Sequence, residues 1–249
     1  MVHYRSCSVH HLAFTGPSLK EGTKWYQGVF HCGYHSEKSY GAASYLIVQP
    51  EGNILVDSPR YTDRLARNIE MLGGVRYMFL THKYDYMIPC RFSSKVCDYN
   101  KLSLVIRDDV ADHKKWSKRL SCDRILHAKD VEFSTADVEV KLEGSGPWSL
   151  GDVIELIHTP GHTAGSVCLL YKSGKVLFTG DHLGMDESGC LSIMETYNWY
   201  SVPMQLNSVR MLLELDFEWI LPGHGRKVGF ADMEDKNSAL EAFLAASRT

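Results

Sequence analysis

One segment constrains this chain more than any other, Thr159 to Ser166, which reads Thr-Pro-Gly-His-Thr-Ala-Gly-Ser. It lies between the alternating apolar run 153–157 and the apolar run 167–171, so it must connect two strands. Pro160 cannot continue a strand ladder and Gly161 permits backbone angles closed to other residues, which forces a turn. The turn presents His162 at the carboxyl end of a strand, a good position for a metal ligand. A lone histidine in a hairpin is more often a capping or surface residue, so other residues must support this assignment.

The composition is that of an ordinary globular protein, with 249 residues of which 44% are hydrophobic and 23% charged. That length suits one large domain or two small ones. The net charge of −3 gives no electrostatic footprint for nucleic acid or an anionic membrane, and no apolar run approaches the roughly 20 residues of a membrane span. We therefore expect a small-molecule substrate and no nucleic-acid or membrane partner, and the sequence leaves the oligomeric state open. Seven cysteines, scattered without a Cys-x-x-Cys pair, indicate reduced thiols in an intracellular compartment.

The order of apolar patterns predicts a layered α/β fold. Residues 1–28 show no clear period and are expected to form an irregular N-terminal segment, whereas 29–249 are expected to form one domain. Turn signals separate short apolar runs of strand period from longer runs of helical period. The succession strand, strand, helix, strand indicates sheets covered by helices. We expect strands at 44–48, 53–56, 75–80, 125–127, 138–142, 153–157, 167–171, 175–178 and 219–221, and helices at 62–72, 114–120, 203–215 and 232–246.

Residues of the types that bind metals recur where these strands end. Imidazole and carboxylate groups at separate strand ends suit a divalent zinc, iron or manganese ion. Several lie in glycine-bearing turns, where a small residue lets the backbone fold tightly and directs a side chain into a cleft. One such histidine is weak evidence, but a series of them in chain order is not expected by chance. The candidates are Asp57, His82 with Asp112 and His113 downstream, His162, Asp181 and His224.

At this point the chain resembles a known family. Residues 41–229 are similar to the metallo-β-lactamase superfamily through five motifs: Leu-Val-Asp-Ser at 55–58, Thr-His at 81–82, Thr-Pro-Gly-His-Thr-x-Gly-Ser at 159–166, Phe-Thr-Gly-Asp at 178–181 and Leu-Pro-Gly-His-Gly at 221–225. The resemblance implies a four-layer αββα sandwich, with two mixed sheets face to face, helices outside, and a metal site at one edge.

Within the superfamily, residues 30–41 resemble a stretch of plant and cyanobacterial proteins that carry a ferredoxin-like segment ahead of the hydrolase domain. The present chain lacks the ferredoxin cysteine pattern, so no iron–sulfur cluster is expected. The resemblance implies a plant protein in the chloroplast or cytoplasm.

The first metal motif departs from the family pattern. The superfamily has His-x-His-x-Asp-His directly after Thr, whereas here Thr81 and His82 are followed by Lys-Tyr-Asp-Tyr-Met. The missing half is found again 30 residues later as Asp112 and His113. Removal of 84–107 would bring the two halves together, so we interpret 84–107 as an insertion in the metal loop.

The resemblance also implies roles for individual residues. Asp181 is expected to bridge two metal ions, Asp57 to orient ligands without binding metal, and Asp112 to act in catalysis by orienting a metal-bound hydroxide. No serine nucleophile is required, and no G-x-S-x-G elbow surrounds Ser166. The implied metal ligands are His82, Asp112, His113, His162, Asp181 and His224, and they would hold one or two zinc ions or, alternatively, iron.

Three functions follow from this reading. The first is a metallo-hydrolase, with zinc as the expected metal, which cleaves a small ester, thioester or lactone-like substrate through a metal-bound hydroxide. The second is a mononuclear iron enzyme similar to sulfur dioxygenases, because a split first motif could leave room for one metal. The third is an impaired family member that acts as a binding protein. The sequence favours an enzyme but does not identify the substrate.

Overall fold

The computed structural model describes residues 28–34, 42–83 and 112–247. The expected N-terminal segment and the expected insertion at 84–107 therefore lie outside the described residues, apart from Gly28. The helices are α1 (Asp63–Met71), α3 (His113–Leu120), α4 (Val202–Met211) and α5 (Met233–Ala246). The strands are β1 (Val29–Tyr34), β2 (Ala43–Ile47), β3 (Ile54–Val56), β4 (Tyr77–Phe79), β5 (Asp123–His127), β6 (Val140–Leu142), β7 (Trp148–Leu150), β8 (Ile154–His158), β9 (Val167–Tyr171), β10 (Val176–Gly180), β11 (Gly184–Met185), β12 (Leu191–Ser192), β13 (Trp219–Pro222) and β14 (Val228–Gly229).

Two six-stranded mixed sheets form the body of the molecule. The first has the order β1-β2-β3-β4-β5-β6, and its strands from β3 to β6 run parallel. The second has the order β14-β13-β10-β9-β8-β7, in which only β10 and β13 pair in parallel. A separate two-stranded ribbon joins β11 to β12. Because β3, β4, β10 and β13 carry the expected site residues at their carboxyl ends, this topology determines where those residues meet.

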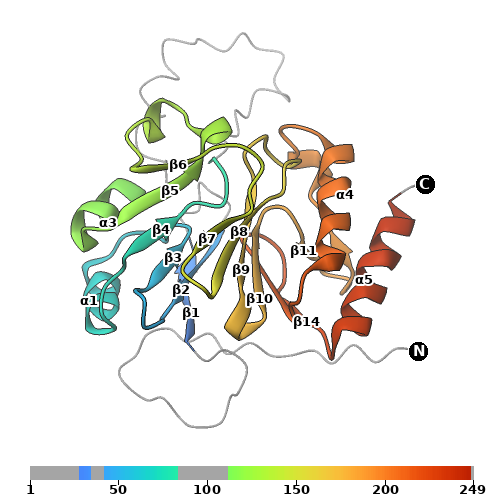
Figure 1. The fold of residues 1–249 in the computed structure, drawn as a ribbon, viewed down its shortest axis with the longest axis horizontal. Coiled ribbons are helices and arrows are strands. Elements are labelled where there is room, and N and C mark those ends of the chain that lie inside the picture. Colours follow the sequence, from blue (N-terminus) through green and yellow to red (C-terminus); the bar gives the residue numbers. More distant parts are fainter. Residues whose placement is uncertain (1–27, 35–41, 84–111, 248–249) are drawn as a thin grey trace.

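Three apolar layers hold the sheets and helices together. Side chains such as Tyr45, Phe79 and Phe178 fill the space between the two sheets. On the outer faces, Trp116 belongs to the layer under α1 and α3, and Leu240 to the layer under α4 and α5. Figure 1 shows α1 and α3 on one side of the sheets and α4 and α5 on the other. The chain therefore has the αββα sandwich expected from its sequence.

The helix starts follow local capping rules. The side chains of Thr62, Ser201 and Asp232 each accept a hydrogen bond from a backbone N–H in the first turn of α1, α4 and α5. The expected helix 203–215 is shorter than its apolar pattern, because α4 ends at Met211 and a 3₁₀ turn follows at Leu212–Glu214. Strands β1 and β7 and the two-residue strands were not predicted, since short or mixed runs carry little periodic signal. None of the helices in the described part of the chain is long and apolar enough to cross a membrane.

Candidate metal centre

Three side chains from three strand ends converge at the edge where the two sheets meet. His82 follows β4 in the first sheet, whereas His162 and Asp181 follow β8 and β10 in the second. Asp181 Oδ2 lies 3.6 Å from His82 Nε2 and 3.8 Å from His162 Nε2. One ligand atom of each residue lies within 4.8 Å of the others. The two imidazole rings stand edge to face with their centroids 4.9 Å apart, so their nitrogens can approach one point.

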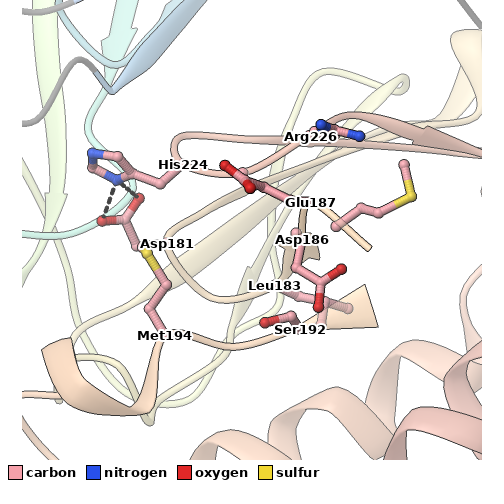
Figure 2. A pocket seen from close by; sticks show the side chains of 11 residues that line it. Asp181, Leu183, Asp186, Glu187, Ser192, Met194, His224 and Arg226 are labelled. Carbon is pink, nitrogen blue, oxygen red and sulfur yellow. Dashed lines mark hydrogen bonds and ion pairs between the residues drawn. The ribbon is translucent and has the colours of Figure 1, made fainter. Parts of the chain in front are cut away.

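His224 adds a fourth side chain, and a third imidazole ring, to this cluster from the end of β13. Its Nδ1 lies 2.8 Å from each carboxylate oxygen of Asp181. Figure 2 shows both contacts, with the His224 ring above the Asp181 carboxylate. His224 is more exposed than the other two histidines, with 21% of its side chain accessible against 11% for His82 and 4% for His162. It therefore lies at the solvent side of the cluster.

The cluster stabilises the ionised form of the Asp181 carboxylate. Burial by itself would raise the pKa of Asp181, but the neighbouring rings of His82, His224 and His162 together hold that pKa well below its usual range. A carboxylate that stays ionised while buried among imidazoles is a strong anionic ligand. The donor set of two imidazoles and one carboxylate fits zinc and also iron, since both metals are held by such groups in proteins.

Glycine at two positions allows the strand ends to approach this closely. Gly180 precedes Asp181 and has φ of +52°, and a Cβ there would lie 2.4 Å from Thr81 Oγ1. A Cβ on Gly223, which precedes His224, would lie 2.7 Å from Asp181 Oδ1. Any larger residue at either position would push two ligand loops apart. The glycines of the Thr-Gly-Asp and Pro-Gly-His motifs are thus a steric requirement of the site.

Asp57 supports the cluster indirectly, through Thr81, in agreement with the expected role of orienting ligands without binding metal. It accepts hydrogen bonds from the backbone N–H of Thr81 at 2.9 Å and from the Thr81 hydroxyl at 3.0 and 3.1 Å. Thr81 Oγ1 in turn lies 2.9 Å from His82 Nδ1. If His82 donates from Nδ1 to the hydroxyl, its Nε2 is left as the acceptor that faces the cluster. Burial raises the pKa of Asp57 to about 7, although Thr81 donates to it.

Asp130 is a residue that the sequence analysis missed. It lies in the 3₁₀ turn that follows β5 and is 1% exposed. Its Oδ2 accepts from the backbone N–H of Lys83 at 2.9 Å and from the Thr163 hydroxyl, and its Oδ1 accepts from the N–H of Gly165 at 2.8 Å. It therefore ties the loop of His82 to the loop of His162. Its position three residues beyond an expected strand was the available signal.

The structure does not bring Asp112 and His113 to this cluster. Asp112 precedes α3, where Oδ2 accepts from the backbone N–H of Tyr61 at 2.6 Å and Oδ1 pairs with Lys115 Nζ at 2.7 Å. His113 is buried, and its Nδ1 lies 3.2 Å from the Arg124 guanidinium. Burial and then the Arg124 charge lower the pKa of His113 to about 4. Both side chains are thus engaged by Tyr61 ahead of α1, by α3 and by β5. The segment that connects them to His82 lies outside the described residues.

A cavity of about 330 Å³ opens beside Asp181 and His224. Its walls come from the ribbon β11–β12, the segment after β12 and the loop after His224, and they carry Leu183, Met185, Met194 and Ser192. In Figure 2, Met194 lies next to Asp181. A small substrate placed there would contact the candidate metal centre directly.

Comparisons with known proteins agree with this geometry. Residues 111–224 match the model of the family described as the metallo-beta-lactamase superfamily. The chain is 25% identical over 201 residues to the probable metallo-hydrolase MJ0888 of Methanocaldococcus jannaschii, a match that covers 75% of this chain and 88% of that protein.

Two solved structures illustrate the likeness in fold. The DIM-1 metallo-beta-lactamase exposed to ceftazidime superposes with a TM-score of 0.61 at 17% identity, covering 91% of this chain and 96% of that one. TTHA1623 in a di-iron-bound form superposes with a TM-score of 0.52 at 18% identity, covering 80% of this chain and 93% of that one.

Proposed function

The chain belongs to the metallo-β-lactamase superfamily, and from this premise we propose that it is a metal-dependent hydrolase of a small ester, thioester or lactone. The observation that carries the proposal is the convergence of His82, His162 and Asp181, the last of which lines a cavity. His224, in contact with Asp181, would complete the donor set. Zinc is the metal we propose first.

The chain's own residues have separate tasks in such a reaction. A bound zinc ion would supply a water of lowered pKa and polarise the attacked carbonyl. Thr81 fixes the orientation of the His82 ring, and Asp130 fixes the two loops that carry His82 and His162. His224 Nδ1 lies 2.8 Å from the Asp181 carboxylate and donates to it when that nitrogen carries the proton. Met194 and Leu183 exclude bulk water from one side of the cavity. We assign no step to Asp112, because its carboxylate is engaged by Tyr61 and Lys115.

Metal analysis of the purified protein tests this function. The hydrolase should contain zinc, and His162→Ala or Asp181→Ala should each lower its content, whereas exposed Asp152→Ala should not. Unchanged occupancy in both site variants would refute the site. Hydrolysis by the zinc-loaded protein is then measured with a panel of simple esters and thioesters.

The family resemblance and the free cysteines of the described residues support a reducing compartment, the chloroplast or cytoplasm, as the location of this protein.

A second candidate is an iron-dependent oxygenase. The donor set of two histidines and one carboxylate is the set that holds iron in many non-haem oxygenases, and TTHA1623 binds two irons in a similar fold. One iron per chain, together with oxygen consumption on a persulfide substrate, would favour this reading over hydrolysis. A protein that stays metal-free after reconstitution with zinc and with iron would reject both enzymes and leave the binding-protein alternative.

A further inference from the structure

The wall of the cavity is joined to the last ligand loop by backbone contacts. The N–H of Arg226 donates to the carbonyl of Met185 at 2.7 Å, and the N–H of Met185 donates to the carbonyl of Arg226 at 3.1 Å. Between His224 and Arg226, Gly225 has φ of +90°, and a Cβ there would lie 3.0 Å from the Met185 carbonyl oxygen. The backbone of Arg226 is therefore fixed two residues beyond His224, and its side chain lines the same cavity as the candidate metal centre.

Two opposite charges on this wall have no partner within the described residues. The side chains of Arg226 and Glu187 are both exposed, line the cavity, and form no ion pair with each other or with another described group. Asp186 differs, because its Oδ1 accepts from Ser188 N, Ser188 Oγ and Cys190 N and so is used to hold its own turn. In Figure 2, Glu187 lies between His224 and Arg226. The cavity thus offers an available guanidinium at one end and the metal centre at the other.

We propose that Arg226 binds a carboxylate of the substrate, so that the acyl part carries a free carboxylate in addition to the bond that is cleaved. This inference rests on the proposed hydrolase function. A guanidinium presents a planar fork that matches a carboxylate with two parallel hydrogen bonds. Met185 and Met194 contribute apolar lining to the same cavity, which suits a short methylene chain between the two functional groups. Glu187 repels further negative charge, so the pocket selects substrates with one free carboxylate.

Removal of each of the two neighbouring charges should change glutarate binding in opposite directions, which allows a test. Glutarate and butyrate serve as probes, because they have similar length and differ by one carboxylate. Binding of each probe to the zinc-loaded protein is measured by calorimetry. Wild-type protein should bind glutarate more tightly than butyrate. Arg226→Gln should weaken glutarate binding about ten-fold, the size of one lost charged hydrogen-bonded contact, and leave butyrate unchanged. Glu187→Gln should strengthen glutarate binding. Melting temperatures of the probe-free variants check that they fold.

Several results would overturn the inference. Equal binding of the two probes, or no change in glutarate binding in Arg226→Gln, removes the carboxylate site. If the cationic probe butylamine binds more tightly than glutarate, and Glu187→Gln loses that binding, then this wall of the cavity binds an ammonium group and not a carboxylate.

Kinetics separates this inference from the function on which it rests. Mono-4-nitrophenyl glutarate should be hydrolysed with a lower KM than 4-nitrophenyl butyrate, and Arg226→Gln should abolish that difference. Hydrolysis of both esters with equal KM would leave the hydrolase intact and refute the role of Arg226. If neither ester is hydrolysed but glutarate binding still depends on Arg226, the hydrolase function is refuted and the carboxylate site is retained.

Discussion

At the scale of single residues, the candidate metal centre depends on groups that never touch the cavity. Asp130 contributes no ligand, yet it accepts hydrogen bonds from the backbone after His82 and from two groups after His162. Groups that orient metal ligands commonly affect metal affinity strongly, because a ligand held slightly out of place loses its bond to the ion. His113 is the opposite of Asp130. It has a side chain of the type that binds metal, but it lies in the interior, where it packs and contacts Arg124 and does not reach the cluster.

Asp130→Asn should weaken zinc binding by about 10- to 100-fold while the fold is kept. An amide replaces one carboxylate oxygen by a donor, so the contacts to Lys83, Thr163 and Gly165 cannot all be kept. Zinc affinity is measured by competition with a chromogenic chelator. Glu132→Gln, which removes the partly exposed ion pair to Lys83 and keeps an oxygen that can accept in the capping box of its own turn, is the control. Equal affinity of Asp130→Asn and the control would contradict a positioning role for Asp130.

His113 should make stability depend on pH. Its folded pKa of about 4 lies below the unfolded value of 6.5, so the stabilisation is present above pH 6.5 and is lost as pH falls towards 4. The difference corresponds to about 3 kcal/mol. Urea unfolding of wild type and His113→Gln at pH 7.5 and 4.5 measures it, and the variant should lose less stability between these values. The comparison cancels contributions from other titrating groups, and parallel losses would show that His113 does not titrate in this way.

At the scale of elements, a lysine fastens the last helix to the body of the molecule. Lys236 on α5 is fully buried, and its Nζ donates to the carbonyls of Leu212, Leu213 and Leu215 at the end of the α4 region. The ammonium also lies 4.7 Å from the centroid of the Phe217 ring. The Leu212 carbonyl also accepts from the backbone N–H of Leu215, so the ammonium adds a second donor there and supplies a donor to the carbonyls of Leu213 and Leu215 at the end of the 3₁₀ turn.

Lys236→Met should destabilise the protein by about 1–3 kcal/mol, since a thioether of similar length cannot donate to the partly buried carbonyls of Leu213 and Leu215. The free energy of unfolding is measured in urea. Lys118→Met, an exposed lysine on α3, should leave it unchanged. A stable Lys236→Met variant would mean that water replaces the ammonium, and the proposed fastening role would then be wrong.

At the scale of the whole molecule, the candidate metal centre takes its residues from both sheets. The sheets also meet through apolar packing and through hydrogen bonds such as that from the Tyr45 hydroxyl on β2 to the Pro222 carbonyl on β13. His82 belongs to the first sheet, whereas His162, Asp181 and His224 belong to the second. An ion held by both sets resists separation of the sheets. Metal binding to the folded chain alone must therefore contribute to stability.

Removal of metal should lower the melting temperature. At a free zinc concentration 100 times the Kd, binding stabilises the fold by about 2.7 kcal/mol, which corresponds to roughly 5–10 °C for a chain of this size. The melting temperature is recorded with added zinc and with a chelator. Asp181→Ala should show little difference between the two conditions. An equal shift in wild type and Asp181→Ala would place the stabilising metal elsewhere.

Local physics explains what the sequence determined by itself. Strand and helix periods, together with turns such as Pro160-Gly161, predicted a layered α/β fold and positioned His82, His162, Asp181 and His224 at strand ends, whereas the αββα sandwich was implied by the family resemblance. Each of these signals is contained within a few neighbouring residues, and the parallel ends of strands share one edge. The resemblance to the superfamily added a ligand set by analogy, which is why it also included Asp112 and His113.

Only the tertiary structure decided which of the candidates meet. Asp130 joins loops 47 and 33 residues away along the chain, and Arg226 pairs with Met185 across 41 residues, contacts for which no local pattern exists. His113 and His82 have the same chemistry, but packing against Arg124 keeps the first in the interior and Thr81 directs the second to the cluster. Residue type and spacing specify a capacity to bind metal. The packing of one sheet on the other determines which of these residues come together as a candidate metal site.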